Sequence, residues 1–391
     1  MLIDTRFRPA RTPTATALVS LTALAMLSAC SGGSSGGGGG GGDVTMQPIP
    51  SPTPTMAPAP TPTPAPTPTP TPSFTQIQAA IDASPVPNIY VAIGTNAGVI
   101  YRYQKGNFSP TGVTSIASAS KMLSGATILR LVEAGRMSLS DHPQKYLSYW
   151  TNDPADQRSQ VTLQQLLSFT SGFDEDEGDR GCITDGTTTL AACAQEFYNR
   201  GLGSVPGTAF NYGPAHLQIA GAMAEAASGL TFRQLFRQQV ADVAGMSNAT
   251  DYVFASTTNP RLGGGGVSTV EDYIRFLDAM LNRRLLTDID SYTADRTAGL
   301  TVLNTPDVTI SNGQWHYALA SWHECDDTPF SARCTPLKLV SSPGAFGWTP
   351  WIDYDRGYWA LIGMEVPNGS QYGVGLEQQL QPIINDYLGK P

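Results

Sequence analysis

The sequence has few charged residues and little positive charge. Charged residues make up 14% of the 391, with 23 basic against 32 acidic residues, and only five residues are lysine. The formal net charge of −9 argues against nucleic acid or anionic lipid head groups as partners. After residue 30, no apolar run reaches the length of a transmembrane helix.

The first 30 residues have the organisation of a bacterial export signal. Three arginines precede an apolar stretch from about residue 15 to 27, which leads into Leu27-Ser28-Ala29-Cys30. This order predicts a signal peptide over residues 1–29, and its end resembles a lipobox, in which Cys30 is lipidated. Ordinary cleavage beside an incidental cysteine is the alternative. Because Ser31 rather than Asp follows, we expect an exported protein that is lipid-anchored to the bacterial outer membrane and faces the periplasm or the surface.

Residues 30–72 cannot bury a core. Gly36–Gly42 is a glycine run, and Pro48–Pro72 largely alternates proline with threonine, serine or alanine. Such a segment is a tether, whose proline-rich part reaches on the order of 75–80 Å at about 3.1 Å per residue. The remaining residues, 73–391, are long enough for one large domain or two intimately packed lobes.

Cysteine is scarce, and its placement is informative. Apart from Cys30, the cysteines form two close pairs, Cys182 with Cys193 and Cys325 with Cys334. In an exported chain these short intervals predict two local disulfides, each contributing roughly 2.5–3 kcal/mol in the chain-entropy model. Zinc is the alternative, but the one histidine with suitable spacing stands beside Cys325, so we expect no metal site.

The domain has strands near both ends and helices between them. Apolar periodicity predicts helices over residues 73–83, 163–168, 215–228, 232–244, 269–285 and 374–388. Strand patterns occupy residues 89–94, 99–103, 337–341, 345–352 and 358–364. We therefore expect an α/β (α+β) fold, in which an antiparallel sheet is flanked by the N- and C-terminal helices and carries an inserted helical lobe.

One serine stands three residues before a lysine, in Ser118-Ala-Ser-Lys121. The motif opens an apolar-periodic run that ends at Gly135, which predicts a further helix, buried in the core. In the first turn of a helix, the backbone N–H of Ser118 is unpaired and lies at the positive end of the helix dipole. Lys121 lies on the same face and can exchange a proton with the serine hydroxyl. The spacing alone is a weak signal.

Three further stretches accompany this motif: Met137–Asp141, Val161–Phe173 and Gly263–Tyr273. By their order and spacing, the chain resembles the serine β-lactamase and penicillin-binding-protein superfamily. The likeness is closest to the class C-like branch with D,D-peptidases and family-VIII carboxylesterases, and it covers essentially all of residues 75–390. The resemblance implies a β-lactamase/transpeptidase-like fold and acyl transfer by Ser118, without a metal or organic cofactor.

The second catalytic motif of this family is Tyr-x-Asn, which matches Tyr212-Gly213-Pro214. The resemblance implies that Tyr212 acts with Lys121 as the proton relay. Both groups have ordinary pKa values near 10, so each needs the other and partial burial to work at neutral pH. Pro214 replaces the asparagine that holds the amide of the substrate's acyl side chain. His216 either biases the proton of Tyr212 or simply packs in the core.

The third motif, Lys-Thr-Gly or His-x-Gly in the family, matches Ser342-Pro343-Gly344. Ser342 takes the place of the cation, so a donor remains but the fixed charge for a substrate carboxylate is lost. Gly344 permits a close backbone approach, and Pro343 fits an edge strand. Pro214, Ser342 and Gly344 are thus the candidate substrate-binding residues. The resemblance implies an oxyanion hole formed by the N–H groups of Ser118 and Ala345.

We therefore expect a serine hydrolase that cleaves a carboxylic ester through an acyl-enzyme, because the nucleophile set is whole while both recognition motifs are altered. The alternative enzyme is a D,D-peptidase or weak β-lactamase. The alternative from another class is a catalytically silent protein that binds peptidoglycan or a partner. The expected partners are a small-molecule ester or cell-wall peptide substrate and, through the N-terminal lipid, a membrane. The sequence does not indicate an oligomeric state.

Overall fold

The structure is a computed structural model that describes residues 73–174, 181–306, 315–325, 327 and 329–390. The predicted signal peptide, Cys30 and the linker to residue 72 lie outside these residues. Among the helices of the described part, none combines the length and the apolar character that a membrane span requires.

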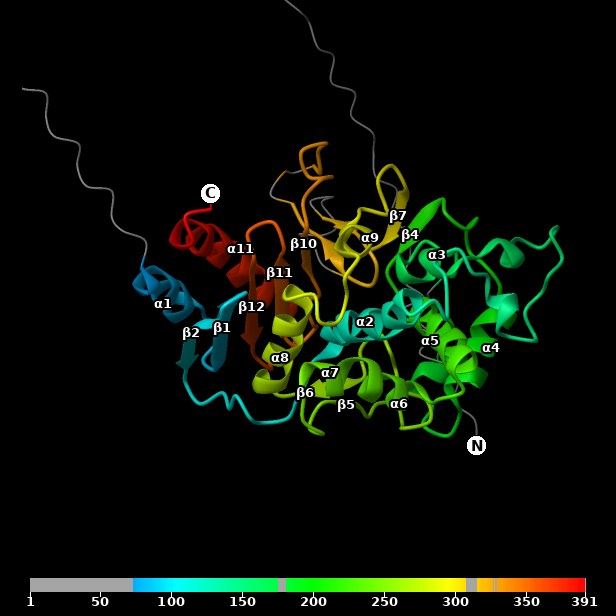
Figure 1. Ribbon diagram of the computed structural model, residues 1–391, viewed down its shortest axis with the longest axis horizontal. Coiled ribbons are helices and arrows are strands. Elements are labelled where there is room, and N and C mark those ends of the chain that lie inside the picture. The colour runs from blue at the N-terminus through cyan, green and yellow to red at the C-terminus, as the bar shows by residue number, and fades with distance from the viewer. Residues whose placement is uncertain (1–72, 175–180, 307–314, 326, 328, 391) are drawn as a thin grey trace, which may run out of the picture. The chain divides into compact units, whose positions relative to one another are not determined.

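An antiparallel sheet joins the two ends of the domain (Figure 1). Its seven strands within the described residues lie in the order β2 (Gly98–Lys105), β1 (Ile89–Thr95), β12 (Tyr358–Gly363), β11 (Thr349–Asp353), β10 (Leu339–Ser341), β9 (Trp322–His323) and β8 (His316–Tyr317). The central pairing sets Ala92 opposite Leu361, which are far apart in the sequence. The expected antiparallel sheet, built from distant segments, is confirmed.

The terminal helices α1 (Phe74–Ala83) and α11 (Ser370–Tyr387) cover one face of this sheet (Figure 1). Successive residues of a strand point to opposite faces. Val91 therefore packs with Ile81 and Leu380 from these helices, while its neighbour Ala92 belongs to the cluster on the other face. The alternation explains why β1 is apolar at nearly every position.

The other face carries the inserted helices, and α8 packs directly on β1, β11 and β12. The inserted elements are α2 (Ser120–Glu133), α3 (Leu163–Leu167), α4 (Leu190–Arg200), α5 (Ala215–Ser228), α6 (Phe232–Phe236), α7 (Asp242–Ala244), α8 (Val270–Leu281) and α9 (Ile289–Thr293). Most of α2 is buried, because α5 and α6 pack around it. The nucleophile segment thus begins at the sheet and runs into the helical lobe.

Two small sheets hold the loops around α2. One has the order β3 (Thr114–Ser115), β6 (Gly266–Ser268) and β5 (Asp251–Tyr252). The other pairs β4 (Ala209–Asn211) in parallel with β7 (Thr301–Asn304). The structure also forms both predicted disulfides, with Cα–Cα distances of 5.2 Å for Cys182–Cys193 and 5.4 Å for Cys325–Cys334.

Several predicted elements differ from the observed ones. The helix expected over residues 269–285 ends at Leu281, the helix expected from residue 374 begins at Ser370, and the strand expected from residue 337 begins at Leu339. The strand expected from residue 345 begins only at Thr349, because Gly344 to Gly347 form a turn in which Gly347 N–H donates to the Gly344 carbonyl at 2.8 Å. Gly347 has φ +95°, which favours glycine. The helix expected over residues 232–244 is interrupted by a π-helical turn at Arg237–Ala241.

Candidate active site

Ser118 lies in a short 3₁₀ turn, Ala117–Ala119, directly before α2. The sequence predicted that Ser118 lies in the first turn of the α-helix. In the structure it lies in the 3₁₀ turn that leads into this helix. Ala117 has φ +44°, an uncommon backbone conformation for a residue with a Cβ. Hydrogen bonds hold the turn in this shape: Ser120 Oγ donates to the Ala117 carbonyl at 2.6 Å, and the Tyr273 hydroxyl donates to the Ala119 carbonyl at 2.8 Å. The direction of the serine side chain is therefore fixed by its surroundings.

Lys121 is buried beneath this turn and points back at the serine. Its Nζ donates to Ser118 Oγ at 3.0 Å and to the Gly263 carbonyl at 2.5 Å. The lysine is 4% exposed, so these contacts replace most of its hydration. The amine is within reach to exchange a proton with the serine hydroxyl.

Tyr212 follows directly after the end of β4 and lies beside both Ser118 and Lys121. Its hydroxyl is hydrogen-bonded to Ser118, and Lys121 Nζ lies 4.5 Å from the centre of its ring. The ring of Trp322 stacks on that of Tyr212, with 5.2 Å between the ring centroids. The ring centroids of Phe169 and Tyr317 lie 5.5 and 6.1 Å from that of Tyr212. These aromatic contacts fix the position of the hydroxyl.

The electrostatic surroundings keep Tyr212 protonated in the resting site. Burial raises the pKa of Tyr212 above its ordinary value, while the hydrogen bond with Ser118 and the positive charge of Arg261 act in the opposite direction. A neutral phenol can donate its proton to a leaving group. It can accept a proton from the serine only if it first transfers its own proton to another group. Lys121, whose Nζ lies 4.5 Å from the centre of the ring, is a group that could receive that proton.

His216 has a structural position behind Tyr212. Its Nδ1 lies 2.8 Å from Ser171 Oγ and its Nε2 lies 2.8 Å from the Asn211 carbonyl, and its ring stacks on Phe169. Burial lowers the pKa of His216 to about 4, so the ring is neutral at physiological pH. Of the two roles considered from the sequence, packing is the one that this geometry supports.

Ser342 does not present its hydroxyl to a substrate. The residue follows the end of β10 and is 2% exposed, and its Oγ donates to the Ser118 carbonyl at 2.7 Å. The donor expected to remain for a substrate carboxylate is therefore engaged within the protein. Ser342 ties the strand to the nucleophile turn instead of recognising a ligand.

Gly344 brings the next turn against the same segment. A Cβ on Gly344 would lie 2.3 Å from the carbonyl oxygen of Ile116, a distance that real Cβ atoms do not adopt. The residue after it, Ala345, is exposed, and its N–H has no hydrogen-bond acceptor among the described residues. The expected second oxyanion donor is thus on a turn that touches the nucleophile segment.

Pro214 stands at the N-terminal end of α5 and is partly exposed. Its Cα would be 3.9 Å from a Cβ on Gly263, the residue whose carbonyl holds Lys121. The structure thus places Pro214 close to Gly263 and Lys121, where it offers no side-chain donor or acceptor.

The sequence reasoning missed the part played by the glycines that follow Arg261. Gly263 supplies a carbonyl to Lys121, and the N–H of Gly266 donates to Ser120 Oγ at 3.0 Å. A Cβ on Gly266 would lie only 2.7 Å from that oxygen. The run of four glycines was the available signal, because close backbone approach is a common reason for such a run.

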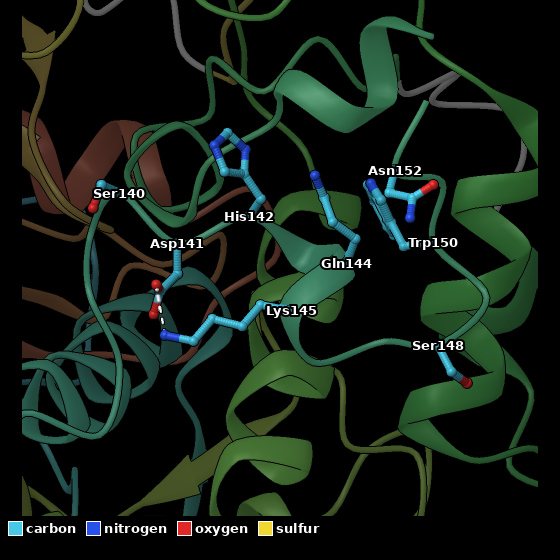
Figure 2. Close-up of a pocket in the computed structure, with 8 residues that line it drawn as sticks. All are labelled: Ser140, Asp141, His142, Gln144, Lys145, Ser148, Trp150 and Asn152. Carbon is cyan, nitrogen blue, oxygen red and sulfur yellow. Dashed lines mark hydrogen bonds and ion pairs between the residues drawn. The ribbon is translucent and has the colours of Figure 1, made fainter. Parts of the chain in front are cut away.

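A separate polar cavity of about 450 Å³ is lined by residues of the segment that connects α2 to α3 in the sequence (Figure 2). It is lined by Ser140, Asp141, His142, Gln144, Lys145, Ser148, Trp150 and Asn152. Two of these lining residues, Asp141 and Lys145, form an ion pair of 2.8 Å. None of Ser118, Lys121 and Tyr212 lines this cavity, so it belongs to a different region of the chain.

A grouping of possible metal ligands among the described residues is Cys325, Asp327 and Cys334. Its two sulfur atoms are joined in a disulfide, so neither is a thiolate that could bind a metal. The residues around Ser118 contain no comparable grouping within the described part of the chain.

Comparisons with known proteins agree on one family. Residues 75–362 match the family model described as Beta-lactamase. Protein flp of Staphylococcus aureus (strain MW2) is 28% identical over 155 residues, which are 38% of this chain and 31% of that protein. The chain thus spans about a third of the length of the curated relatives that it matches first.

Solved structures show the same fold. A putative β-lactamase from Bacteroides dorei DSM 17855 superposes with a TM-score of 0.68 and 29% identity, covering 81% of this chain and all of that one. EstCE1, a hydrolase with promiscuous acyltransferase activity, superposes with a TM-score of 0.62 and 16% identity, covering 78% of this chain and 97% of that one. The fold and family expected from the motifs are confirmed.

Proposed function

This chain belongs to the β-lactamase family of serine hydrolases, and from that premise we propose that it hydrolyses carboxylic esters through an acyl-enzyme on Ser118. The observation that carries the proposal is the contact of one serine with two proton-transfer groups. Lys121 Nζ lies 3.0 Å from Ser118 Oγ, and the Tyr212 hydroxyl is hydrogen-bonded to the same serine. A nucleophile bonded to such groups is the expected arrangement for covalent catalysis.

In the acylation step, Ser118 Oγ forms a bond to the ester carbonyl carbon while its proton passes to the Lys121/Tyr212 pair. The negative charge that develops on the carbonyl oxygen is stabilised by the N–H groups of Ser118 and Ala345. When the tetrahedral intermediate collapses, the bond to the alcohol oxygen breaks, and Tyr212 gives that oxygen a proton. The acyl group then remains on Ser118.

In the deacylation step, a water molecule attacks the acyl-enzyme and gives its proton to the same pair. The bond between the acyl carbon and Ser118 Oγ breaks, and the serine regains a proton from the pair. One ester and one water have then become one acid and one alcohol. The protons are carried by Lys121 and Tyr212 throughout, so the cycle returns both to their starting state.

The preference for esters is supported by what surrounds the nucleophile. The Ser342 hydroxyl is used by the Ser118 carbonyl, so it supplies neither charge nor a donor to a substrate carboxylate. Pro214 has no side-chain amide to hold the acyl amide of a peptide or β-lactam. An ester needs neither partner. The fold is also shared with EstCE1, a hydrolase with promiscuous acyltransferase activity.

Parallel labelling with a fluorescent fluorophosphonate and a fluorescent penicillin tests the proposal. We expect strong labelling by the fluorophosphonate, weak labelling by the penicillin, and no labelling of Ser118→Ala by either. Strong labelling by penicillin would favour a penicillin-binding or β-lactamase role. Absence of both labels would favour the catalytically silent alternative.

The substrate preference gives a quantitative prediction. The purified protein should hydrolyse short-chain aryl esters with a kcat/KM at least about tenfold above that for a chromogenic cephalosporin, equivalent to about 1.4 kcal/mol of transition-state stabilisation. Ser118→Ala should abolish both reactions, and Tyr212→Phe should slow acylation by about two orders of magnitude or more. Faster turnover of the cephalosporin would contradict the ester preference, and ester turnover by Ser118→Ala would contradict the mechanism.

A further inference from the structure

A cavity of about 90 Å³ is lined by residues of β4, β7, β8 and β9 and of the segment before β7. It shares no lining residue with the polar cavity of Figure 2. Most of its lining side chains are aromatic or aliphatic: Phe210, Leu300, Val302, Trp315, Tyr317 and Trp322. The cavity therefore suits an apolar group.

Two of these lining residues also contact Tyr212. Trp322 stacks on the ring of Tyr212 and Tyr317 meets it edge-on, with 5.2 and 6.1 Å between the ring centroids. The same two rings pack on Phe210, with centroid distances of 5.7 and 5.2 Å. One layer of aromatic rings thus borders both the cavity and the tyrosine whose hydroxyl is hydrogen-bonded to Ser118.

Strand β7 is tied to the backbone of Tyr212. The Tyr212 N–H donates to the Asn304 carbonyl at 3.2 Å, and Asn304 Nδ2 donates to the Tyr212 carbonyl at 2.9 Å. Two residues before Asn304, Val302 pairs with Phe210 of β4 and lines the cavity. Its neighbour Leu303 does not line the cavity, because successive residues of a strand point to opposite faces. The two side chains are similarly exposed, at 56% and 52%.

His316, another lining residue, is held in one orientation. Its Nδ1 lies 2.6 Å from Asp295 Oδ2, and its ring stacks on Phe330 with 3.6 Å between the centroids. The walls of the cavity are therefore fixed by contacts within the protein. A site that is formed before its ligand arrives loses less conformational freedom on binding.

The size of the cavity limits what can enter it. An apolar cavity of about 150 Å³ can hold benzene, so one of about 90 Å³ matches a smaller group, such as a short branched alkyl chain. In the proposed mechanism, the alcohol oxygen of the ester lies at the Tyr212 hydroxyl, which protonates it. The substituent on that oxygen therefore extends past Tyr212, whereas the acyl carbon is bound to Ser118.

We propose that this cavity binds the alcohol part of the ester substrate and selects esters of small, branched apolar alcohols. The inference rests on the proposed function and deepens it, because it names the leaving group. Val302 and Leu300 would then be specificity-determining residues, on a wall that the Ser118, Tyr212 and Ser342 motifs do not include.

The test compares ethyl acetate with isobutyl acetate, whose alcohols are similar in acidity but differ by two carbons. Burying two further carbons, at roughly fourfold each, predicts a kcat/KM at least about tenfold higher for the isobutyl ester in the wild-type protein. Val302→Trp fills the cavity and should reduce this preference to below about threefold. Leu303→Trp, on the other face of the same strand, is the matched control and should keep the preference. Thermal unfolding shows whether both variants fold.

Two further measurements separate the cavity from the chemistry at Ser118. Val302→Trp should still take the fluorophosphonate label, because fluoride is the leaving group and no alcohol has to be bound. Ethyl butyrate adds the two carbons to the acyl part instead, and its kcat/KM relative to ethyl acetate should stay within about twofold of the wild-type ratio in Val302→Trp.

Each contrary outcome overturns a definite statement. Wild-type protein that takes no label contradicts the proposed function and this inference with it. Labelled wild-type protein without a preference for isobutyl acetate contradicts the inference alone, as does an equal loss of preference in Leu303→Trp. A change confined to the butyrate ratio would assign the cavity to the acyl part and overturn the proposal. If Val302→Trp does not fold, Leu300→Ala decides: the isobutyl preference should fall at least about threefold, and an unchanged preference contradicts the inference.

Discussion

Gly344 is the residue at which the β10–β11 turn touches the nucleophile segment. A Cβ there would lie 2.3 Å from the Ile116 carbonyl oxygen and 3.2 Å from that of Trp348, and both are backbone atoms that cannot swing aside. The separation of the two segments therefore leaves room for a hydrogen atom but not for a methyl group. Together with the hydrogen bond from Ser342 to the Ser118 carbonyl, this contact sets the position of Ala345 relative to Ser118.

Gly344→Ala should damage both stability and activity. We expect a loss of about 1–3 kcal/mol in the free energy of unfolding, because the turn must move away. We also expect at least about tenfold slower labelling of Ser118, because Ala345, the proposed oxyanion donor, moves with the turn. Chemical denaturation and fluorophosphonate labelling measure the two effects. The control is Gly375→Ala in α11, where a Cβ meets nothing within 4 Å, which should gain about 0.5–1 kcal/mol. Equal behaviour of the two variants would contradict the argument.

His216 should make the folded protein sensitive to mild acid. Burial lowers the pKa of His216 from 6.5 to about 4 in the folded protein. Between these two pH values the unfolded chain carries a proton on this histidine and the folded protein does not. Stability should therefore fall as the pH drops from about 6.5 to 4 and then level off, by about 3 kcal/mol from this residue. In His216→Gln this contribution is absent. Urea unfolding of both proteins at pH 7, 5.5 and 4 measures it, and parallel stability curves would show that the histidine does not contribute.

At the scale of elements, α11 meets the sheet through an acidic contact. Glu377 of α11 is fully buried next to Glu324, which follows β9 and accepts a hydrogen bond of 2.8 Å from Gln381. Burial, followed by the charge and hydrogen bonding of Glu324, raises the pKa of Glu377 well above its ordinary value. The helix therefore docks with this carboxyl group protonated.

This contact predicts that the docking of α11 weakens as the pH rises. The unfolded chain loses the Glu377 proton near pH 4.5 while the folded protein keeps it, so stability is lost above that pH. Glu377→Gln keeps the shape without the ionisable group. Its melting temperature should rise relative to wild type by at least about 2 °C between pH 5 and pH 8. A constant difference in melting temperature over this range would count against the idea.

Long elements with their own signals were predictable from the sequence, and short ones were not. The bounds of α5 were predicted as observed, because an apolar run ends there at Gly229 with φ +75°. Strands β8 and β9 have two residues each, too few to show a period, and their pairing is decided by distant neighbours. Helix α4 was missed although Thr189 caps it, which was a readable start signal.

The same distinction holds within the site. Ser118, Lys121 and Tyr212 could be selected as candidates because their motifs are local, and the structure brings all three together. The roles of Gly263 and Ser342 were not predictable, because each is a tertiary contact with a backbone carbonyl. Gly263 offers its own carbonyl to Lys121, and Ser342 donates to the carbonyl of Ser118. A side-chain pattern cannot report where a distant carbonyl will lie.

At the scale of the whole molecule, the hydrolase domain is one part of a longer chain. Each disulfide joins cysteines that are close in the sequence, with separations of 11 and 9, so it stabilises only a local segment. The pairing of β1 with β12 in the sheet connects the two ends of the domain. The predicted export signal and tether lie in the residues before 73. We propose that they hold the domain on the bacterial outer membrane through lipid on Cys30.

Cys30→Ala tests this attachment. The variant should lose its lipid, partition into the aqueous phase of a detergent extraction, and keep a longer N-terminus, because lipoprotein processing needs the cysteine. Ser31→Ala is the matched control, since it leaves the cysteine in place and should stay in the detergent phase. Partitioning of Cys30→Ala identical to that of wild type would contradict lipid attachment. Ester hydrolysis should be unchanged in both variants.

The hydrogen bond from Ser342 to the Ser118 carbonyl also constrains how this protein can evolve. In the family pattern, this position carries a cation that meets a ligand, whereas here the serine is buried and joins two parts of the framework. A single Ser342→Lys exchange would remove that tie and force a charged side chain into a site with 2% exposure. We therefore expect it to cost stability before it gains any affinity for a carboxylate. If the proposed ester preference holds, a change toward carboxylate binding at this position needs a compensating substitution first, so more than one mutational step separates the two specificities.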